Sequence, residues 1–134
     1  MRVRLHRARG VTIGSNVWIG YDTILETAFP HLITIEDNVE IGIRVIVIAH
    51  FREHSGVTIE CDAFLGPGVI VLTPAVVGHG AVVTAGSVVT RSIPPMTLAQ
   101  GNPAIPIAKM TVPFGHDSTM SHAEFYRSLR PLRK

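Results

Sequence analysis

Aliphatic residues recur every six positions along most of this 134-residue chain. A small or β-branched residue lies four places after most of them, and therefore two places before the next aliphatic residue. Residues two apart point to the same side of an extended strand, so both can enter one interior. A period of six does not match the 3.6-residue turn of an α-helix, and glycine recurs throughout the pattern. The aliphatic positions are Ile13, Ile19, Leu25, Ile35, Ile41, Val47, Ile59, Leu65, Val71, Val77, Val83 and Val89.

Each six-residue unit predicts one short strand followed by one corner, and three units close a triangular coil. Gly, Asn and Asp are frequent between the aliphatic residue and the small one, where they relieve the strain of a sharp turn. Hydrophobic residues make up 46% of the chain but aromatic residues only 6%, which suits a narrow, repeated core. Twelve units at three per coil predict an all-β fold, a parallel β-helix of about four coils.

The repeat is expected to form one domain over residues 11–109. Residues 1–10 lie outside the register and are expected to form an N-terminal arm. Residues 110–134 also depart from the repeat and are expected to form a loop and a short helix.

Ser121 and Glu124 have the spacing of a capping box, which predicts the start of that helix. The helix is expected to run through about Leu129, after a loop at 111–120. Phe125 lies four residues before Leu129, so both share one face that would pack on the prism or on a neighbouring subunit.

Two steps of the repeat are longer than six residues, after Leu25 and after Val47. Both residues fall on the third face of successive coils, so the excursion loops 26–34 and 48–58 are predicted to leave from the same corner. Loops stacked on one edge of a rigid solenoid are where function is expected.

Counting along the two loops places His50 roughly above Ala28, within reach of Glu26 and Thr27. Histidine titrates near neutral pH and can accept the proton of a hydroxyl. Glu26, or Glu53 in the second loop, could orient His50 or hold a substrate hydroxyl. The sequence therefore places a candidate catalytic base, His50, beside the candidate substrate-binding residues Glu26, Thr27 and Glu53.

The outward residue just before the buried aliphatic is itself aliphatic all along the third face, at Ile24, Ile46, Ile70 and Val88. An exposed aliphatic stripe marks an interface, and a prism with one such face closes economically as a threefold ring. We therefore expect a homotrimer. Trp18 and Phe64 occupy the same outward slot on a neighbouring face, where they would either pack at the interface or wall a ligand groove.

Charge and cysteine content bound the remaining possibilities. The formal net charge of +2 gives no sign of a nucleic-acid partner. The basic residues gathered at both ends are typical of solvated termini, and a phosphate-bearing partner is the alternative. Cys61 is the only cysteine, which excludes an intrachain disulfide and favours a reducing compartment. No apolar run reaches the length of a membrane span, and residues 1–10 do not match a secretory signal. A cytoplasmic location is expected.

Three segments resemble the hexapeptide-repeat acyltransferases, especially the sugar O-acetyltransferases such as galactoside acetyltransferase and those of surface-polysaccharide synthesis. Residues 45–50 are similar to the strand that ends in the family's catalytic histidine. Residues 84–95 resemble its last coil and Pro-Pro exit, and residues 100–104 its Gly-X-Pro-Ala segment. The resemblance covers about residues 11–109. It implies a left-handed helix, a homotrimer and acetyl-CoA as co-substrate, and no metal is expected.

The resemblance also implies which residues bind CoA, in a groove along the prism between two subunits. Two residues depart from the family pattern. Ile105 stands where members often carry arginine, and Lys109 could supply the phosphate contact instead. Phe64 stands where many members have tryptophan. The implied CoA-binding residues are Gly66, Pro67, Ala85, Gly86, Thr90, Arg91, Asn102, Pro103 and Lys109.

The favoured function is transfer of an acetyl group from acetyl-CoA to a hydroxyl of a sugar, with direct attack in a ternary complex and His50 as general base. An amino sugar, serine or an antibiotic is an alternative acceptor, and the acyl chain could be longer than acetyl. Two other classes stay open. One is a zinc carbonic anhydrase on the same prism, using His50, His54 and His79. The other is a non-catalytic scaffold.

Overall fold

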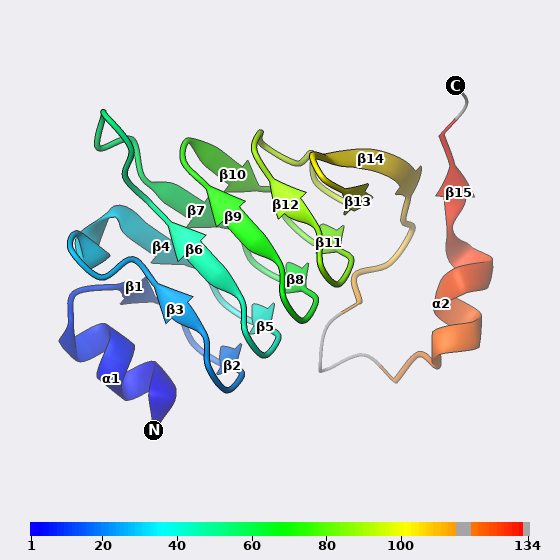
Figure 1. The fold of residues 1–134 in the computed structure, drawn as a ribbon. Coiled ribbons are helices and arrows are strands. Elements are labelled where there is room, and N and C mark those ends of the chain that lie inside the picture. The colour runs from blue at the N-terminus through cyan, green and yellow to red at the C-terminus, as the bar shows by residue number, and fades with distance from the viewer. Residues whose placement is uncertain (115–118, 133–134) are drawn as a thin grey trace.

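The computed structural model describes residues 1–114 and 119–132. Figure 1 shows four stacked coils of parallel strands, with a helix at the N-terminal end and a hairpin at the other. The fold is a left-handed parallel β-helix, as the repeat and the resemblance predicted. Each coil contributes one strand to each of three faces.

The three faces are ladders in strict coil order. Face A contains β1 (Thr12–Ile13), β4 (Ile33–Ile35), β7 (Val57–Ile59) and β10 (Ala75–Val77). Face B contains β2 (Trp18–Ile19), β5 (Glu40–Ile41), β8 (Phe64–Leu65) and β11 (Val82–Val83). Face C contains β3 (Ile24–Leu25), β6 (Ile46–Ile48), β9 (Ile70–Leu72) and β12 (Val88–Val89). Face B continues into β13 (Thr97–Gly101), β14 (Ala104–Lys109) and β15 (Arg130–Pro131), which pair antiparallel beyond β13.

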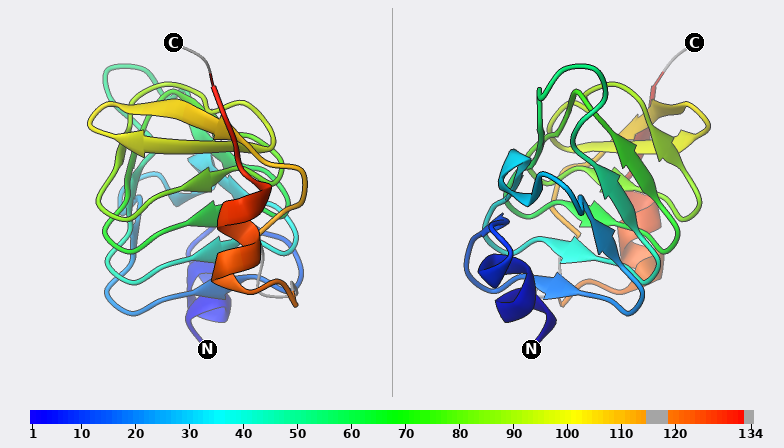
Figure 2. Two further views of the ribbon diagram at one scale, coloured as in Figure 1. Left: turned by 90° about the vertical axis from the view of Figure 1, so that its right-hand side faces the viewer. Right: turned by 60° about the vertical axis from the view of Figure 1, so that its left-hand side comes forward.

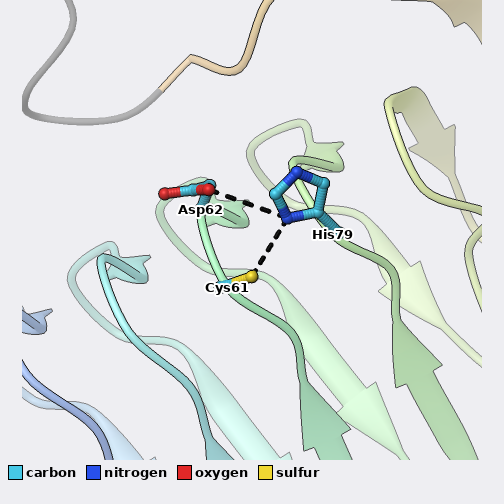
Figure 3. Close-up of side chains that lie close together, drawn as sticks. All are labelled: Cys61, Asp62 and His79. Carbon is cyan, nitrogen blue, oxygen red and sulfur yellow. Dashed lines mark hydrogen bonds and ion pairs between the residues drawn. The ribbon is translucent and has the colours of Figure 1, made fainter.

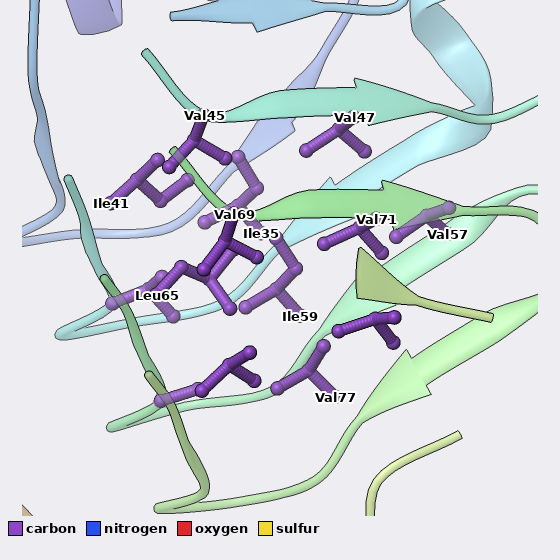
Figure 4. Packing of buried hydrophobic residues seen from close by; sticks show 14 of the residues in the cluster. Ile35, Ile41, Val45, Val47, Val57, Ile59, Leu65, Val69, Val71 and Val77 are labelled. Atoms are coloured by element: carbon purple, nitrogen blue, oxygen red, sulfur yellow. The ribbon is translucent and has the colours of Figure 1, made fainter. Parts of the chain in front are cut away.

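The core is a column of aliphatic side chains stacked on their counterparts in the next coil. Ile13 pairs with Ile35 and Ile35 with Ile59, so each side chain lies over another of the same kind. All twelve repeat positions are buried, and Figure 4 shows the column from inside. Burying one such side chain contributes about 1.5–3 kcal/mol, so the fold rests on many equal small contributions.

The corners recur with one backbone conformation. Three residues after the aliphatic position, five non-glycine residues have positive φ, from Asn16 at 55° to Asp62 at 62°. Asn and Asp were expected there, but Arg44 also adopts this conformation, with φ of 56°. The ladder on both sides fixes the corner, so the coil geometry prevails over the preference of a single residue.

Residues 1–10 form the short helix α1 (Arg2–Ala8), which the sequence analysis did not foresee. Three arginines of this segment close the open edge of the first coil. In each later coil, a strand's last carbonyl accepts from the coil before it, as Ile35 O does from Gly14 N. The first coil has no preceding coil, and guanidinium groups donate instead: Arg7 to Ile13 O at 3.1 Å, Arg2 to Ile19 O at 2.8 Å and Arg9 to Leu25 O at 2.8 Å.

The C-terminal helix α2 (His122–Ser128) begins at the predicted capping box, with Ser121 accepting from Glu124 N and Glu124 accepting from Ser121 N. Phe125 is buried against face B of the same chain, with Leu129 beside it, and Figure 2 shows α2 along the side of the coils. Residues 115–118 of the predicted loop lie outside the described residues. Within the described part of the chain, neither helix has the length and apolarity that crossing a membrane requires.

The arginine cap makes a testable contribution to stability. Arg9 donates to the carbonyls of Leu25 and Glu26, and hydrogen bonds to charged groups contribute about 1.5–3 kcal/mol each when shielded from water. Because these carbonyls can be hydrated when the cap is lost, we expect Arg9→Met to lower the free energy of unfolding by about 1–2 kcal/mol in total, measured by urea denaturation. Arg4, exposed on the same helix, gives the control: Arg4→Met should change it by less than about 0.5 kcal/mol. Equal losses in the two variants would contradict a specific cap.

Candidate functional site

Both long steps of the repeat leave face C at the same corner, as predicted. Leu25 at the end of β3 pairs with Val47 in β6, one coil above. The first loop then returns to face A at Ile33 through the 3₁₀ turn η1 (Pro30–Leu32), and the second returns at Val57. The two loops therefore lie one over the other on one edge of the column.

The two loops bring Glu26 and His50 into direct contact. Glu26 Oε2 lies 2.6 Å from His50 Nδ1. The Glu26 side chain is 1% exposed, whereas that of His50 is 36% exposed. The carboxylate thus lies beneath the imidazole, and the imidazole faces the solvent-accessible side of the corner.

Backbone amides of both loops hold the buried carboxylate. Ala28 N and Phe29 N donate to Glu26 Oε1, at 3.0 and 3.4 Å, and Ala49 N donates to Oε2 at 3.0 Å. Burial alone would raise the pKa of Glu26, but the hydrogen bonds from His50 and from these amides outweigh it and lower the pKa to about 2. Glu26 is therefore ionised at neutral pH.

An ionised carboxylate only accepts hydrogen bonds, so His50 Nδ1 must donate to it. In the neutral imidazole this leaves the lone pair on Nε2, the nitrogen turned away from Glu26. The pair has the arrangement of a base and its orienting group. Glu26 was predicted to bind substrate or to orient His50, and its burial and full set of hydrogen bonds fit only the second role.

Phe29 forms an apolar wall at this site that sequence analysis missed. Its ring centroid lies 5.1 Å from that of His50, edge-on, and 4.3 Å from that of His54. A bulky aromatic residue three places after Glu26, in the loop predicted to lie below His50, was the available signal. Thr27 and Glu53, predicted to bind substrate, are both exposed in the two loops.

Three of the predicted CoA-binding residues line one groove, at the corner between faces B and C. The groove has a volume of about 240 Å³ and is lined by Gly66, Pro67 and Ala85. Phe64 forms part of its wall and packs edge-on against Phe114 at 5.3 Å. The opposite wall includes His122, Phe125 and Tyr126, so α2 of the same chain covers the groove. The sequence did not predict this cover.

Two positions at this corner are glycine for different physical reasons. A Cβ on Gly66 would lie 2.7 Å from Ala85 N in the next coil, so glycine is required there by coil stacking alone. Gly86 has φ of 74°, and a Cβ on it would meet no atom within 4 Å. The space beside Gly86 is therefore open, next to Ala85 of the groove. Ser87, buried next to it, ties the corner to the hairpin by accepting from Gly101 N at 3.1 Å.

The other predicted CoA-binding residues are spread over the last coil and the hairpin. Asn102 and Pro103 form the turn between β13 and β14, whereas Lys109 lies at the far end of β14, opposite Thr97. Thr90 and Arg91 follow β12, on the same edge as His50 and two coils above it. One chain alone therefore does not gather the predicted set into a single site.

Face C separates the two parts of the site. The Glu26–His50 pair lies at the edge where face C meets face A, and the groove lies at the edge where it meets face B. Between them lies the aliphatic stripe, with Ile24 46% exposed and Ile46, Ile70 and Val88 half-buried.

The rival histidine set does not converge within one chain. His50 and His54 lie at the corner after face C, with ring centroids 6.4 Å apart. His79 lies between faces A and B, where its Nδ1 approaches Cys61 Sγ at 3.0 Å. Burial and the charges of Asp62 and Glu36 raise the pKa of the Cys61 thiol, so it stays protonated at neutral pH. This disfavours a nucleophilic role.

The hydrogen bonds of Glu26 predict a pH-dependent stability. The pKa is 4.5 ordinarily and about 2 in the fold, so the stabilisation is present above pH 4.5 and is lost as the pH falls toward 2. The two pKa values differ by about 2.5, which corresponds to about 3 kcal/mol in the free energy of unfolding. Glu26→Gln should therefore be less stable at pH 7 and show a flatter dependence between pH 4.5 and 2, measured by urea denaturation at fixed protein concentration. Glu53→Gln, in the exposed neighbouring loop, should keep the wild-type slope. An unchanged slope in Glu26→Gln would argue against the ionised, buried carboxylate.

Sequence comparison identifies relatives with the same repeat. Residues 56–91 match the family model described as bacterial transferase hexapeptide (six repeats). A protein of Schizosaccharomyces pombe, named as a candidate acetyltransferase, is 39% identical over 102 residues. The matched part is 75% of this chain and 44% of that protein, so the chain spans less than half the length of this curated relative.

Solved structures of acetyltransferases share the fold. The polySia-specific acetyltransferase NeuO has a TM-score of 0.66 and 28% identity, covering 82% of this chain and 56% of its own. Serine acetyltransferase from Brucella abortus strain S19, in complex with coenzyme A, has a TM-score of 0.62 and 25% identity, covering 75% of this chain and 40% of its own. The repeat, the coil geometry and these relatives agree: the chain is a hexapeptide-repeat protein with a left-handed parallel β-helix, similar in sequence and fold to acetyltransferases.

Proposed function

We propose that this chain transfers an acetyl group from acetyl-CoA to a hydroxyl group of a small acceptor, with His50 as general base. The observation that carries the proposal is the contact between Glu26 Oε2 and His50 Nδ1 at 2.6 Å, on the two loops that interrupt the repeat. A buried, ionised carboxylate that fixes one ring nitrogen leaves the other available for proton transfer.

The chemistry needs this base because a neutral alcohol is a poor nucleophile. His50 Nε2 takes the hydroxyl proton as the acceptor oxygen attacks the thioester carbonyl. The carbon–sulfur bond then breaks, and the imidazolium returns the proton to the departing CoA sulfur. Glu26 stabilises the imidazolium between these steps and holds the ring in one orientation, so we assign it as a positioning residue.

The groove at the corner between faces B and C is the proposed site for the pantetheine arm of CoA. It is largely apolar, and Gly66, Pro67 and Ala85, whose side chains are small or absent, are among the residues that line it. The open space beside Gly86 adjoins Ala85 of the groove, and the next residue, Ser87, is hydrogen-bonded to Gly101, just before the hairpin turn at Asn102 and Pro103. The CoA complex of the Brucella abortus serine acetyltransferase, which shares the fold, supports CoA as the donor.

A homotrimer would unite the two parts of the site. Since His50 and the groove lie on opposite edges of face C, a complete site requires the groove of one subunit beside His50 of the next. Packing the aliphatic stripe of face C between subunits would achieve this and bury surface that is otherwise exposed. In such a ring, Thr90 and Arg91 would extend the CoA contacts from the side of His50.

We favour a sugar hydroxyl as the acceptor. A second hollow, of about 450 Å³, lies on face A next to the two loops. Four residues with hydroxyl side chains are among those that line it: Thr34, Ser55, Thr58 and Ser92. Such a lining suits an acceptor that has several hydroxyl groups of its own. The likeness to NeuO agrees with a sugar, whereas the likeness to serine acetyltransferase keeps serine as the second candidate.

Replacing the base tests the mechanism. Free thiol released from acetyl-CoA is measured against a panel of sugars, nucleotide sugars, serine and antibiotics. With the acceptor so identified, His50→Ala should lower kcat by about 10²–10⁴-fold, while CoA affinity by calorimetry stays within about twofold, because the residues proposed to hold the pantetheine arm do not include His50. The control is His79→Asn, at a distant corner, with wild-type turnover. Full turnover by His50→Ala would eliminate this mechanism, and failure of every acceptor with no CoA binding would favour a scaffold.

The trimer is tested by charge on the stripe. Ile46→Glu would bury an unpaired carboxylate at the centre of the proposed interface. The desolvation free energy of that charge opposes association of the subunits. We expect a monomer or a mixture by sedimentation velocity, with loss of activity. Val76→Glu places the same charge on the exposed outward side of face A and should leave the trimer intact. A trimer that persists in Ile46→Glu would refute face C as the interface.

A further inference from the structure

A second cluster of chemically capable side chains lies at the corner between faces A and B, away from both parts of the proposed active site. Cys61 and Asp62 follow β7 in the third coil, and His79 follows β10 in the fourth. Figure 3 shows the three side chains pointing toward one another across the two coils. The separation between Cys61 and His79 is 18 residues, the length of one regular coil, so the ladder itself places one over the other.

The three ligand-type atoms surround one point. Cys61 Sγ lies 3.0 Å from His79 Nδ1, and Asp62 Oδ2 lies 3.6 Å from the same nitrogen. One potential ligand atom from each residue lies within 4.8 Å of the other two. With Zn–S of about 2.3 Å and Zn–N and Zn–O of about 2.0–2.2 Å, tetrahedral angles give ligand–ligand distances of about 3.4–3.6 Å. Small side-chain rotations would bring the cluster to that geometry.

A catalytic triad does not explain this arrangement. In a triad the histidine uses one ring nitrogen toward the nucleophile and the other toward the carboxylate. Here Cys61 and Asp62 both approach Nδ1. Three ligand-type atoms therefore face one place, where a cation that displaces the thiol proton would be shared by all of them.

The backbone around the cluster is held in place by two more carboxylates. Glu36 accepts from Cys61 N at 2.9 Å, and Glu60 accepts from His79 N at 3.1 Å. In the part of the chain that the structure describes, no arginine or lysine forms an ion pair with Glu36, Glu60 or Asp62. The backbone of this corner is therefore held in place and the corner is negatively charged, and both properties favour binding of a divalent cation.

We propose that Cys61, Asp62 and His79 form a binding site for a zinc-type transition-metal ion that joins the third coil to the fourth. A thiolate, an imidazole and a carboxylate suit Zn²⁺ and Co²⁺ over the hard cations Mg²⁺ and Ca²⁺. Three protein ligands leave a fourth position for water. The ion would act on stability, since it bridges two coils at a corner that carries neither His50 nor the groove.

Cobalt provides a specific probe, because Cys61 is the only cysteine in the chain. Protein stripped with a chelator is titrated with Co²⁺ and followed by the near-ultraviolet charge-transfer absorption of a cobalt–thiolate bond. We expect the absorption to saturate at one ion per chain and to be removed by Zn²⁺. It should be absent in Cys61→Ser, and in His79→Asn the affinity should fall by more than about tenfold. Asp62→Asn should also weaken binding. His54→Asn, at the corner of the two loops, should bind as wild type does.

A stability measurement complements the spectra. Zn²⁺ should raise the Tm of the wild type and of His54→Asn but not of Cys61→Ser or His79→Asn, each checked for wild-type circular dichroism. Absence of the thiolate absorption at a tenfold molar excess of Co²⁺ would overturn the site. An absorption of equal strength and affinity in His79→Asn would also overturn it, because Cys61 would then bind cobalt without the proposed partners. Neither readout depends on acetyl transfer.

Discussion

Every coil of this protein depends on the next one for its backbone hydrogen bonds. Strands of two or three residues cannot form a stable structure alone, and each satisfies its amides and carbonyls only through the coils below and above. This ladder fixes the core column, the positive φ of the corners and the need for glycine where coils approach closely. It also creates two open edges. Arg2, Arg7 and Arg9 satisfy the carbonyls at one edge, and the hairpin of β13 and β14 continues face B at the other.

The regular stacking of the coils fixes the position of one buried charge, the carboxylate of Glu26. Glu26 is charged and buried, a combination that costs several kcal/mol unless the charge is fully hydrogen-bonded. Three backbone amides and His50 supply those bonds, and they come from two loops that only the ladder holds together. The stability of the fold is thus what keeps a carboxylate ionised beneath an imidazole.

Much of the fold followed from the spacing of aliphatic residues alone, since a six-residue period admits few structures. Counting faces also predicted that His50 lies within reach of Glu26. The helix α1 was not predicted, because its arginines act on carbonyls that exist only once the first coil has formed. The cover of the groove by α2 depends on tertiary packing of Phe125 and Phe114, which carries no local signal. The proximity of Cys61 to His79 follows from the coil length of 18 residues, which places equivalent corner positions of successive coils one over the other.

The pairing of strands resumes in register on either side of the two loops, β3 with β6 before them and β4 with β7 after them. The length of each loop is therefore mechanically decoupled from the column. A lineage could lengthen, shorten or rewrite residues 27–32 or 51–55 and so exchange one acceptor for another, while the ladder, the proposed base and the proposed donor groove are inherited unchanged. Substrates could then diversify through changes in two surface loops at one corner of the column.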